Sequence, residues 1–236
     1  MKKILWVVNY DSMQDFLDTA VRVGAPGVAI RTDNDVVKAI TAFHAPGIQV
    51  FGWRWPSAKR DAAMKEAAKA LALFEQGMDG YFVDPEGAPG QPYDWDRPGL
   101  APLAAEFCAM VADAAGPRSF GVTSHYRGKK VYPKLPWAAF FKRATVLLPQ
   151  AYWHVDGGVV GHGLPADNYR VSIDFWQATG GKRALIVPMA GELHKVTAAE
   201  INTYVATAAD CGVGELHFYT YTESVREEVW QAIANA

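Results

Sequence analysis

Two hydrophobic patterns alternate along the chain. Short apolar runs, typical of buried strands, are followed by longer stretches in which apolar residues recur every three or four positions, as in amphipathic helices. The predicted strands are residues 4–9, 28–31, 48–53, 80–84, 119–124, 146–152, 184–189 and 215–220. The predicted helices are residues 11–23, 32–44, 59–76, 98–115, 137–142, 168–179, 197–211 and 224–234.

This alternation predicts the fold. Repeated strand–helix units over 236 residues are the pattern of a (β/α)8 TIM barrel, which belongs to the α/β class. No shift in composition divides the chain, so we expect residues 1–236 to form a single catalytic barrel domain. Long connections follow the predicted strands at 85–99, 125–136 and 153–167, whereas the connections that precede strands are short. The carboxyl ends of the strands are therefore the expected place of an active site.

Two acidic residues follow the predicted strand at 80–84. Strand side chains alternate between faces, so Asp84 and Glu86 are expected to share a side with Phe82, while Val83 points the other way. Two carboxylates held close together raise the pKa of one of them, which supplies the proton donor that acid–base chemistry requires. The alternative is an aspartate and a glutamate solvated on a loop.

Polar and aromatic side chains end most of the other predicted strands. Aromatic rings, amides and hydroxyls around carboxylates suit a carbohydrate, whose faces stack on rings and whose hydroxyls need hydrogen bonds. The expected substrate-binding residues are Asn9, Asp11, Arg31, Trp53, Trp95, Tyr126, Gln150, Tyr152, Tyr219 and Tyr221. Tyr152 and Tyr219 could instead belong to the core, Arg31 could be a counter-ion to an aspartate, and Trp6 is expected to pack.

The composition and the motifs of the chain limit the classes of molecule that it is expected to bind. A net charge of −2 and a pI of about 6.3 give no electrostatic surface for nucleic acid. No phosphate-binding or dinucleotide-binding motif and no paired-histidine spacing occurs, so we expect neither a cofactor nor a metal. No apolar stretch is long enough to cross a membrane. We expect a monomer whose partner is a polysaccharide or oligosaccharide.

Two segments resemble known glycosidases. The segment Tyr81-Phe82-Val83-Asp84-Pro85-Glu86 resembles the fourth-strand Asp-x-Glu motif of family 25 glycoside hydrolases, the barrel-shaped lysozymes. Residues 148–153 are similar to the sixth-strand Pro-Gln-x-Tyr/Trp segment of those enzymes and, more distantly, of family 18 chitinases. The family's first-strand aspartate motif is not reproduced, and Asn9 or Asp11 would have to replace it.

The resemblance implies an activity. It assigns Glu86 as the general acid and Asp84 as the carboxylate that stabilises or assists, in a muramidase that cleaves peptidoglycan or another N-acetylhexosamine polymer. Two alternatives remain open at this stage. One is a metal-dependent barrel that combines Asp84 and Glu86 with a loop histidine (His125, His154 or His162), and the other is a sugar-binding barrel without catalysis.

The first residues bear on localisation. The apolar run after Met1-Lys2-Lys3 is short and lacks a cleavage site with small residues, so it reads as a strand rather than as a signal peptide. We therefore expect synthesis in the cytoplasm, with any action on the cell wall depending on release by a phage or a secretion system.

Overall fold

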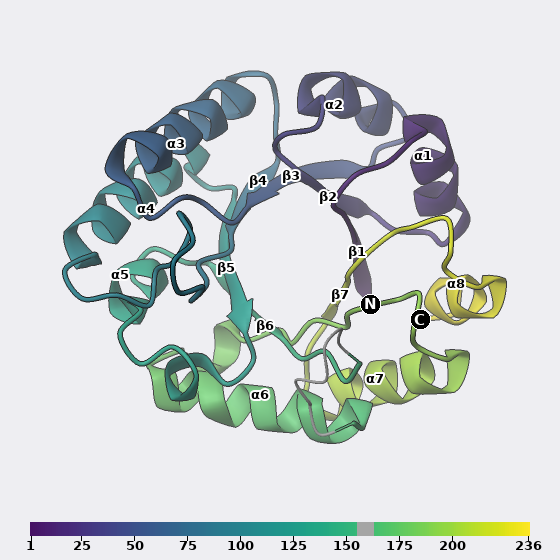
Figure 1. The fold of residues 1–236 in the computed structure, drawn as a ribbon. Coiled ribbons are helices and arrows are strands. Elements are labelled where there is room, and N and C mark those ends of the chain that lie inside the picture. Colours follow the sequence, from purple (N-terminus) through teal and green to yellow (C-terminus); the bar gives the residue numbers. More distant parts are fainter. Residues whose placement is uncertain (155–162) are drawn as a thin grey trace.

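The computed structural model describes residues 1–154 and 163–236 of the chain. The predicted α/β barrel is confirmed: parallel strands form an inner ring and helices cover its outer face (Figure 1). Within these described ranges the sheet has seven strands, in the order β6-β5-β4-β3-β2-β1-β7. They are β1 Lys2–Val7, β2 Gly27–Arg31, β3 Gln49–Arg54, β4 Gly80–Val83, β5 Ser119–His125, β6 Val146–Gln150 and β7 Glu215–Phe218.

Helices connect successive strands, as expected for parallel neighbours. They are α1 Met13–Arg22, α2 Val36–His44, α3 Arg60–Glu75, α4 Ala101–Ala115, α5 Trp137–Phe141, α6 Pro165–Thr179, α7 Ala198–Asp210 and α8 Glu227–Ala234, with short 3-10 turns η1 Gly128–Lys130 and η3 Arg183–Leu185. The predicted start of α7 is confirmed by a reciprocal cap: the Thr197 hydroxyl accepts from the Glu200 N–H, and the Glu200 carboxylate accepts from the Thr197 N–H.

The predicted strand at residues 184–189 is wrong as a regular strand. Its first residues form η3, and the residues that follow pair with β6 and β7 only through isolated bridges. Val187 N–H donates to Leu147 O at 2.8 Å, and Ala190 N–H donates to His217 O at 3.0 Å. This segment still occupies the gap between β6 and β7, so the ring closes without a full eighth strand. Pro188 explains the interruption, since it has no N–H to donate.

The strands divide the buried apolar side chains into an inner and an outer cluster. In β1, Leu5 and Val7 belong to the large cluster shared with the helices, whereas Ile4 and Trp6 belong to a smaller cluster built from strand residues and Met189. The same period of two operates in β4, where Phe82 lies in the small inner cluster and Val83 in the outer one. The predicted orientation of Phe82 and Val83 is thus confirmed.

Aromatic rings fill the inside of the barrel. Phe82 stacks between Trp6 and Phe51, with ring centroids 5.1 and 5.2 Å away. Gly121 of the neighbouring strand makes this possible, because a Cβ at that position would lie 2.6 Å from the Phe82 ring. The resulting aromatic layer forms the floor beneath the side chains at the carboxyl ends of the strands.

Candidate active site

The end of β4 positions two carboxylates. Asp84 follows the strand directly, and its N–H donates to Arg54 O of β3 at 2.8 Å, which continues the ladder by one residue. The loop after Glu86 folds back, so that Trp95 N–H donates to Glu86 O at 2.7 Å. Between the two acids, the Ser124 hydroxyl donates to Pro85 O at 2.7 Å. Hydrogen bonds to β3, to β5 and to the loop after β4 therefore fix the backbone of residues 84–86.

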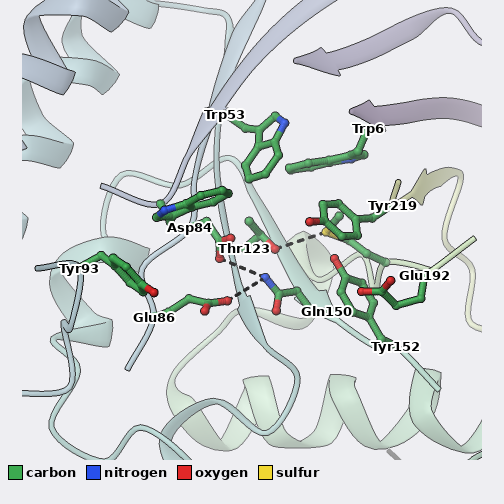
Figure 2. Close-up of a pocket in the computed structure, with 12 residues that line it drawn as sticks. Trp6, Trp53, Asp84, Glu86, Tyr93, Thr123, Gln150, Tyr152, Glu192 and Tyr219 are labelled. Atoms are coloured by element: carbon green, nitrogen blue, oxygen red, sulfur yellow. Dashed lines mark hydrogen bonds between the residues drawn. The ribbon is translucent and has the colours of Figure 1, made fainter. Parts of the chain in front are cut away.

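Gln150, the last residue of β6, joins the two acids. Its side-chain Nε2 donates to Asp84 Oδ1 at 3.0 Å and lies 3.4 Å from Glu86 Oε1 (Figure 2). The Nε2 atom of Gln150 thus lies within hydrogen-bond distance of both carboxyl groups. Asp84 is the deeper of the two, with 7% of its surface exposed, whereas Glu86 is only partly buried and reaches toward the opening.

Burial changes the acidity of this pair. The pKa of Asp84 is raised well above its ordinary value, mainly by desolvation and then by the neighbouring Glu86 carboxylate, and the hydrogen bond from Gln150 opposes the rise. Desolvation also raises the pKa of Glu86, again against the hydrogen bond from Gln150. The pair therefore binds a proton more tightly than two separate carboxylates in water would.

Aromatic side chains wall the cavity above the acids. The cavity has a volume of about 420 Å³, within the range of small-molecule sites. Tyr152 and Tyr219 stack with their ring centroids 5.4 Å apart and form one wall. Its lining residues are Trp6, Trp53, Trp55, Asp84, Glu86, Tyr93, Thr123, Gln150, Tyr152, Met189, Glu192 and Tyr219, most of which Figure 2 labels. Flat rings around a few polar groups are suited to bind a sugar.

The structure brings six of the sequence-predicted site residues together. They come from the carboxyl ends of four strands, β3, β4, β6 and β7, which explains why they meet although they are far apart in the sequence. These residues are Trp53, Asp84, Glu86, Gln150, Tyr152 and Tyr219.

Three predicted aromatic residues are buried elsewhere. Trp95 is fully buried, where its Nε1 donates to Pro56 O and its ring meets Phe140 edge-on. Tyr126 stacks on His125, and Tyr221 packs on Phe16 at 4.8 Å behind the sheet. None of these three is among the residues that line the cavity in the described part of the chain. Their rings contribute to packing.

The predicted residues of the first two strands lie at the rim. Arg31 Nη2 donates to Asn9 Oδ1 at 2.8 Å, and Arg31 also pairs with Asp33, as the counter-ion alternative expected. The Arg31 guanidinium covers the ring of Trp55, with 5.0 Å between its central carbon and the ring centroid. Asp11 is exposed just before α1. None of Asn9, Asp11 and Arg31 is among the described residues that line the cavity, and Arg31 approaches it through its contact with Trp55.

Sequence reasoning missed several lining residues. Tyr93 lines the cavity in place of its loop neighbour Trp95, and Trp6, expected only to pack, forms part of the floor. Glu192 was missed although it lies three residues beyond the strand predicted at 184–189, because the connection after that strand is not one of the three long ones. The available signal for Tyr93 was its place on the same long loop as Glu86.

The residues that the structure describes contain no group of three or more His, Cys, Asp and Glu side chains arranged to hold a metal ion. Of the histidines considered as ligands, His125 stacks on Tyr126 and accepts from the Arg127 N–H. Desolvation, with a smaller effect of Arg127, lowers the pKa of His125 to about 4. His154 pairs with Glu200, and His162 lies outside the described residues.

None of the helices in the described ranges combines the length and the apolar character needed to cross a membrane.

Comparison with known proteins supports the architecture. No family model matches the chain, and no curated protein does. Among solved structures, the chain is similar to the glycoside hydrolase domain of PgaB (BpsB) from Bordetella bronchiseptica, with a TM-score of 0.66 and 10% identity over 99% of this chain and 98% of that one. It is also similar to the Group IV chitinase of Ostrinia furnacalis, with a TM-score of 0.67 and 9% identity over 99% and 98% of the two chains.

A third similar structure is the alpha-galactosidase TtGalA from Thermus thermophilus, with a TM-score of 0.64 and 12% identity over 99% of this chain and 64% of that one. These three structures are named as a glycoside hydrolase domain, a chitinase and an alpha-galactosidase. At such identities the likeness shows that this chain has their barrel fold, and it leaves the chemistry to be argued from the site.

Proposed function

We propose that this protein is a glycoside hydrolase that cleaves a polymer of N-acetylhexosamine units, either peptidoglycan or another such polymer. The observation that carries the proposal is the pair Asp84 and Glu86, linked by Gln150, at the mouth of an aromatic cavity. The names of the similar barrels, a glycoside hydrolase domain and a chitinase, support the same class.

Glu86 is the proposed general acid. It is the less buried carboxyl of the pair, so a glycosidic oxygen entering the cavity can reach it, and desolvation raises its pKa. Its proton passes to the leaving oxygen as the bond to the anomeric carbon breaks. Water then adds at that carbon and returns a proton to Glu86. The enzyme is thereby restored with no net gain or loss of protons.

Asp84 is proposed to assist at the sugar. It lies deeper, between the floor and Glu86, and Gln150 fixes its carboxyl group. When the proton held by the pair resides on Glu86, the ionised Asp84 can stabilise positive charge that develops at the anomeric carbon, or orient the acetamido group of the substrate so that this group does so. The aromatic walls keep water away and strengthen these electrostatic interactions.

The test is product formation from defined polymers. Purified peptidoglycan sacculi and chitin oligosaccharides are incubated with the protein, and the released fragments are identified by mass spectrometry. We expect hexosamine oligomers from wild type and a loss of about 10²- to 10⁴-fold in Glu86→Gln, the range that a general acid supplies. Thermal unfolding of Glu86→Gln should occur at or above the temperature of wild type, because the amide keeps the shape of the side chain and removes a carboxylate whose pKa burial raises.

A matched control is Glu75→Gln, which changes an exposed glutamate at the end of α3 in the same way. It should keep full activity. Turnover of Glu86→Gln close to that of wild type would remove Glu86 from the mechanism. The absence of released fragments from all of these polymers would refute the proposed activity on them.

A further inference from the structure

Glu192 is a third carboxylate in the cavity, and the mechanism above does not use it. It lines the cavity together with Asp84 and Glu86. In Figure 2 it lies across the cavity from Glu86, beside the stacked rings of Tyr152 and Tyr219. Desolvation raises the pKa values of both tyrosines, and the charges of Asp84, Glu192 and Glu86 raise them further, while Arg31 lowers that of Tyr219. The aromatic wall is therefore flanked by negative charge on two sides.

The backbone at Glu192 has an uncommon conformation. Among the described residues, Glu192 alone has a positive φ without being glycine, with a value of 56°. Such a conformation is uncommon for a residue with a side chain and is worth a functional explanation. The preceding Gly191 has no Cβ, and a Cβ there would lie 2.0 Å from the Tyr152 ring. The Tyr152 ring therefore packs directly on the backbone that presents Glu192.

The charge of the cavity is one-sided. Among its lining residues in the described part of the chain, three are carboxylates and none is a lysine, arginine or histidine. The cations at the rim, Arg31 and Arg54, lie against the ring of Trp55 and both pair with Asp33. The His194 ring lies 3.6 Å from the Glu192 carboxylate, which keeps 20% of its surface exposed. An anionic sugar would be repelled here, whereas a cationic one would be attracted.

A hexosamine offers one group that can carry a positive charge. When its nitrogen is acetylated, the group is a neutral amide, and when it is free, it is an ammonium with three donors. An ammonium donates charge-assisted hydrogen bonds to carboxylates, which are about twice as strong as neutral ones. Tyrosine rings beside the carboxylate add a favourable surface for a cation.

Building on the hydrolase activity proposed above, we infer that Glu192 is a specificity-determining residue that selects polymers in which hexosamine units carry a free amino group. The acid pair would act on the glycosidic bond, and Glu192 would bind the ammonium group at the opposite wall. The same negative charge disfavours units with a carboxylate, such as muramic acid, next to the acids. Within the proposed class, a partly de-N-acetylated polymer is thus the preferred substrate.

Binding is the first test. Affinities are measured by calorimetry for a glucosamine tetramer and for an N-acetylglucosamine tetramer, near pH 6 and at low salt, in the Glu86→Gln background so that no turnover intervenes. Adding Glu192→Gln should weaken binding of the glucosamine tetramer about tenfold or more, as loss of one charge-assisted contact predicts. Binding of the acetylated tetramer should change less than about twofold. Added salt should weaken the first interaction and not the second.

The control is Glu223→Gln in the same background. It removes the same charge from an exposed position on the loop after β7, outside the cavity lining. It should leave both affinities unchanged. Equal weakening of both tetramers by Glu192→Gln would overturn the inference, because it would indicate a hydrogen bond to a hydroxyl. Tighter binding of the acetylated tetramer, or binding of neither, would overturn it too.

Cleavage distinguishes this inference from the proposed function. Wild type should release products from a partly de-N-acetylated polymer faster than from the fully acetylated one, and Glu192→Gln should abolish that difference. Amine-dependent binding without products from either polymer would refute the hydrolase and leave the selectivity of Glu192 intact. Products released at equal rates would support the hydrolase and refute the selectivity.

Discussion

Individual residues determine the chemistry of this cavity through their depth. Asp84 and Glu86 are two positions apart at a strand end, so both point inward, but one is buried and the other reaches the opening. The sequence was sufficient to predict this pair, because alternation along a short apolar strand depends on local geometry alone. The difference in depth depends on how distant parts of the chain, such as Gln150 of β6, pack around the two carboxyl groups, and no sequence pattern reveals it.

Asp84 should destabilise the folded protein at neutral pH. Its pKa is raised on folding by desolvation and by Glu86, so the folded state favours the protonated form. The contribution of Asp84 to folding stability is then most favourable near the unfolded pKa of about 3.9 and below, and it becomes less favourable as the pH rises toward the folded pKa. We expect Asp84→Asn to unfold at a higher temperature than wild type at pH 8, and this gain should vanish near pH 4.

Thermal unfolding between pH 4 and pH 8 measures this effect, with Asp174→Asn, an exposed position in the interior of α6, as the control. The control should follow wild type at every pH. A constant difference between Asp84→Asn and wild type across the range would contradict the prediction. We also expect Asp84→Asn to lose activity, the usual exchange of function for stability at an active site.

At the scale of elements, the loop after β4 shapes the site. The ring of Tyr132, from the loop between β5 and α5, lies against Gly87, directly after the proposed general acid. A Cβ on Gly87 would lie 2.5 Å from this ring and 2.9 Å from the Cβ of Asp96. The glycine therefore allows two loops to meet closely beside Glu86.

Gly87→Ala should displace Glu86. Because Tyr132 and Asp96 both lie too close to the new methyl group, the backbone at residues 86–88 has to move. A displacement of about 1 Å at a reacting group can lower the rate about 10²-fold. We expect a loss of activity of at least about tenfold, measured as kcat/KM on released oligomers. Gly214→Ala is the control, since a Cβ there has no neighbour within 4 Å. Unchanged kcat/KM in Gly87→Ala would show that the loop adapts without moving Glu86.

The elements themselves were largely predictable, and the exceptions have physical causes. The capped start of α7 depends on residues three apart in the sequence, so its prediction was confirmed. The strand predicted at 184–189 failed because apolar content alone does not provide a ladder, and Pro188 removes a donor. Trp95 was expected to bind substrate but is buried away from the cavity, because the folded path of a long loop determines which ring faces the cavity.

At the scale of the whole molecule, the site depends on closure of the ring. Tyr219 and Glu192 reach the cavity only because the segment at residues 186–190 fills the space between β6 and β7. Gln150 of β6 forms a β-bridge with Met189 of this segment, and we call the boundary between β6, residues 186–190 and β7 the seam of the ring. A parallel ring could be predicted from the alternation of elements, but the pairing across its last seam is long-range and leaves no local pattern.

Hydrogen exchange tests whether this seam is as stable as the rest of the barrel. Met189 N–H donates to Pro149 O at 2.9 Å, and Tyr219 N–H donates to Ala190 O at 2.9 Å, while Ile186 and Met189 are almost fully buried. Burial of each such side chain stabilises by about 1.5–3 kcal/mol, which compensates for the missing ladder bonds. We therefore expect these amides to exchange with the global unfolding free energy, at the same level as amides of β2 and β3.

The amide of Gly47, which donates to His44 O in an exposed turn, provides the reference for local opening and should exchange much faster. Exchange at Met189 and Tyr219 as fast as at Gly47 would show that the ring opens at the seam without unfolding. In that case the wall formed by Tyr152, Tyr219 and Glu192 would separate from the acid pair in the open state. Uniform protection, by contrast, means that both walls of the cavity belong to one cooperative unit, so the distance between Glu86 and Glu192 is fixed before a sugar arrives.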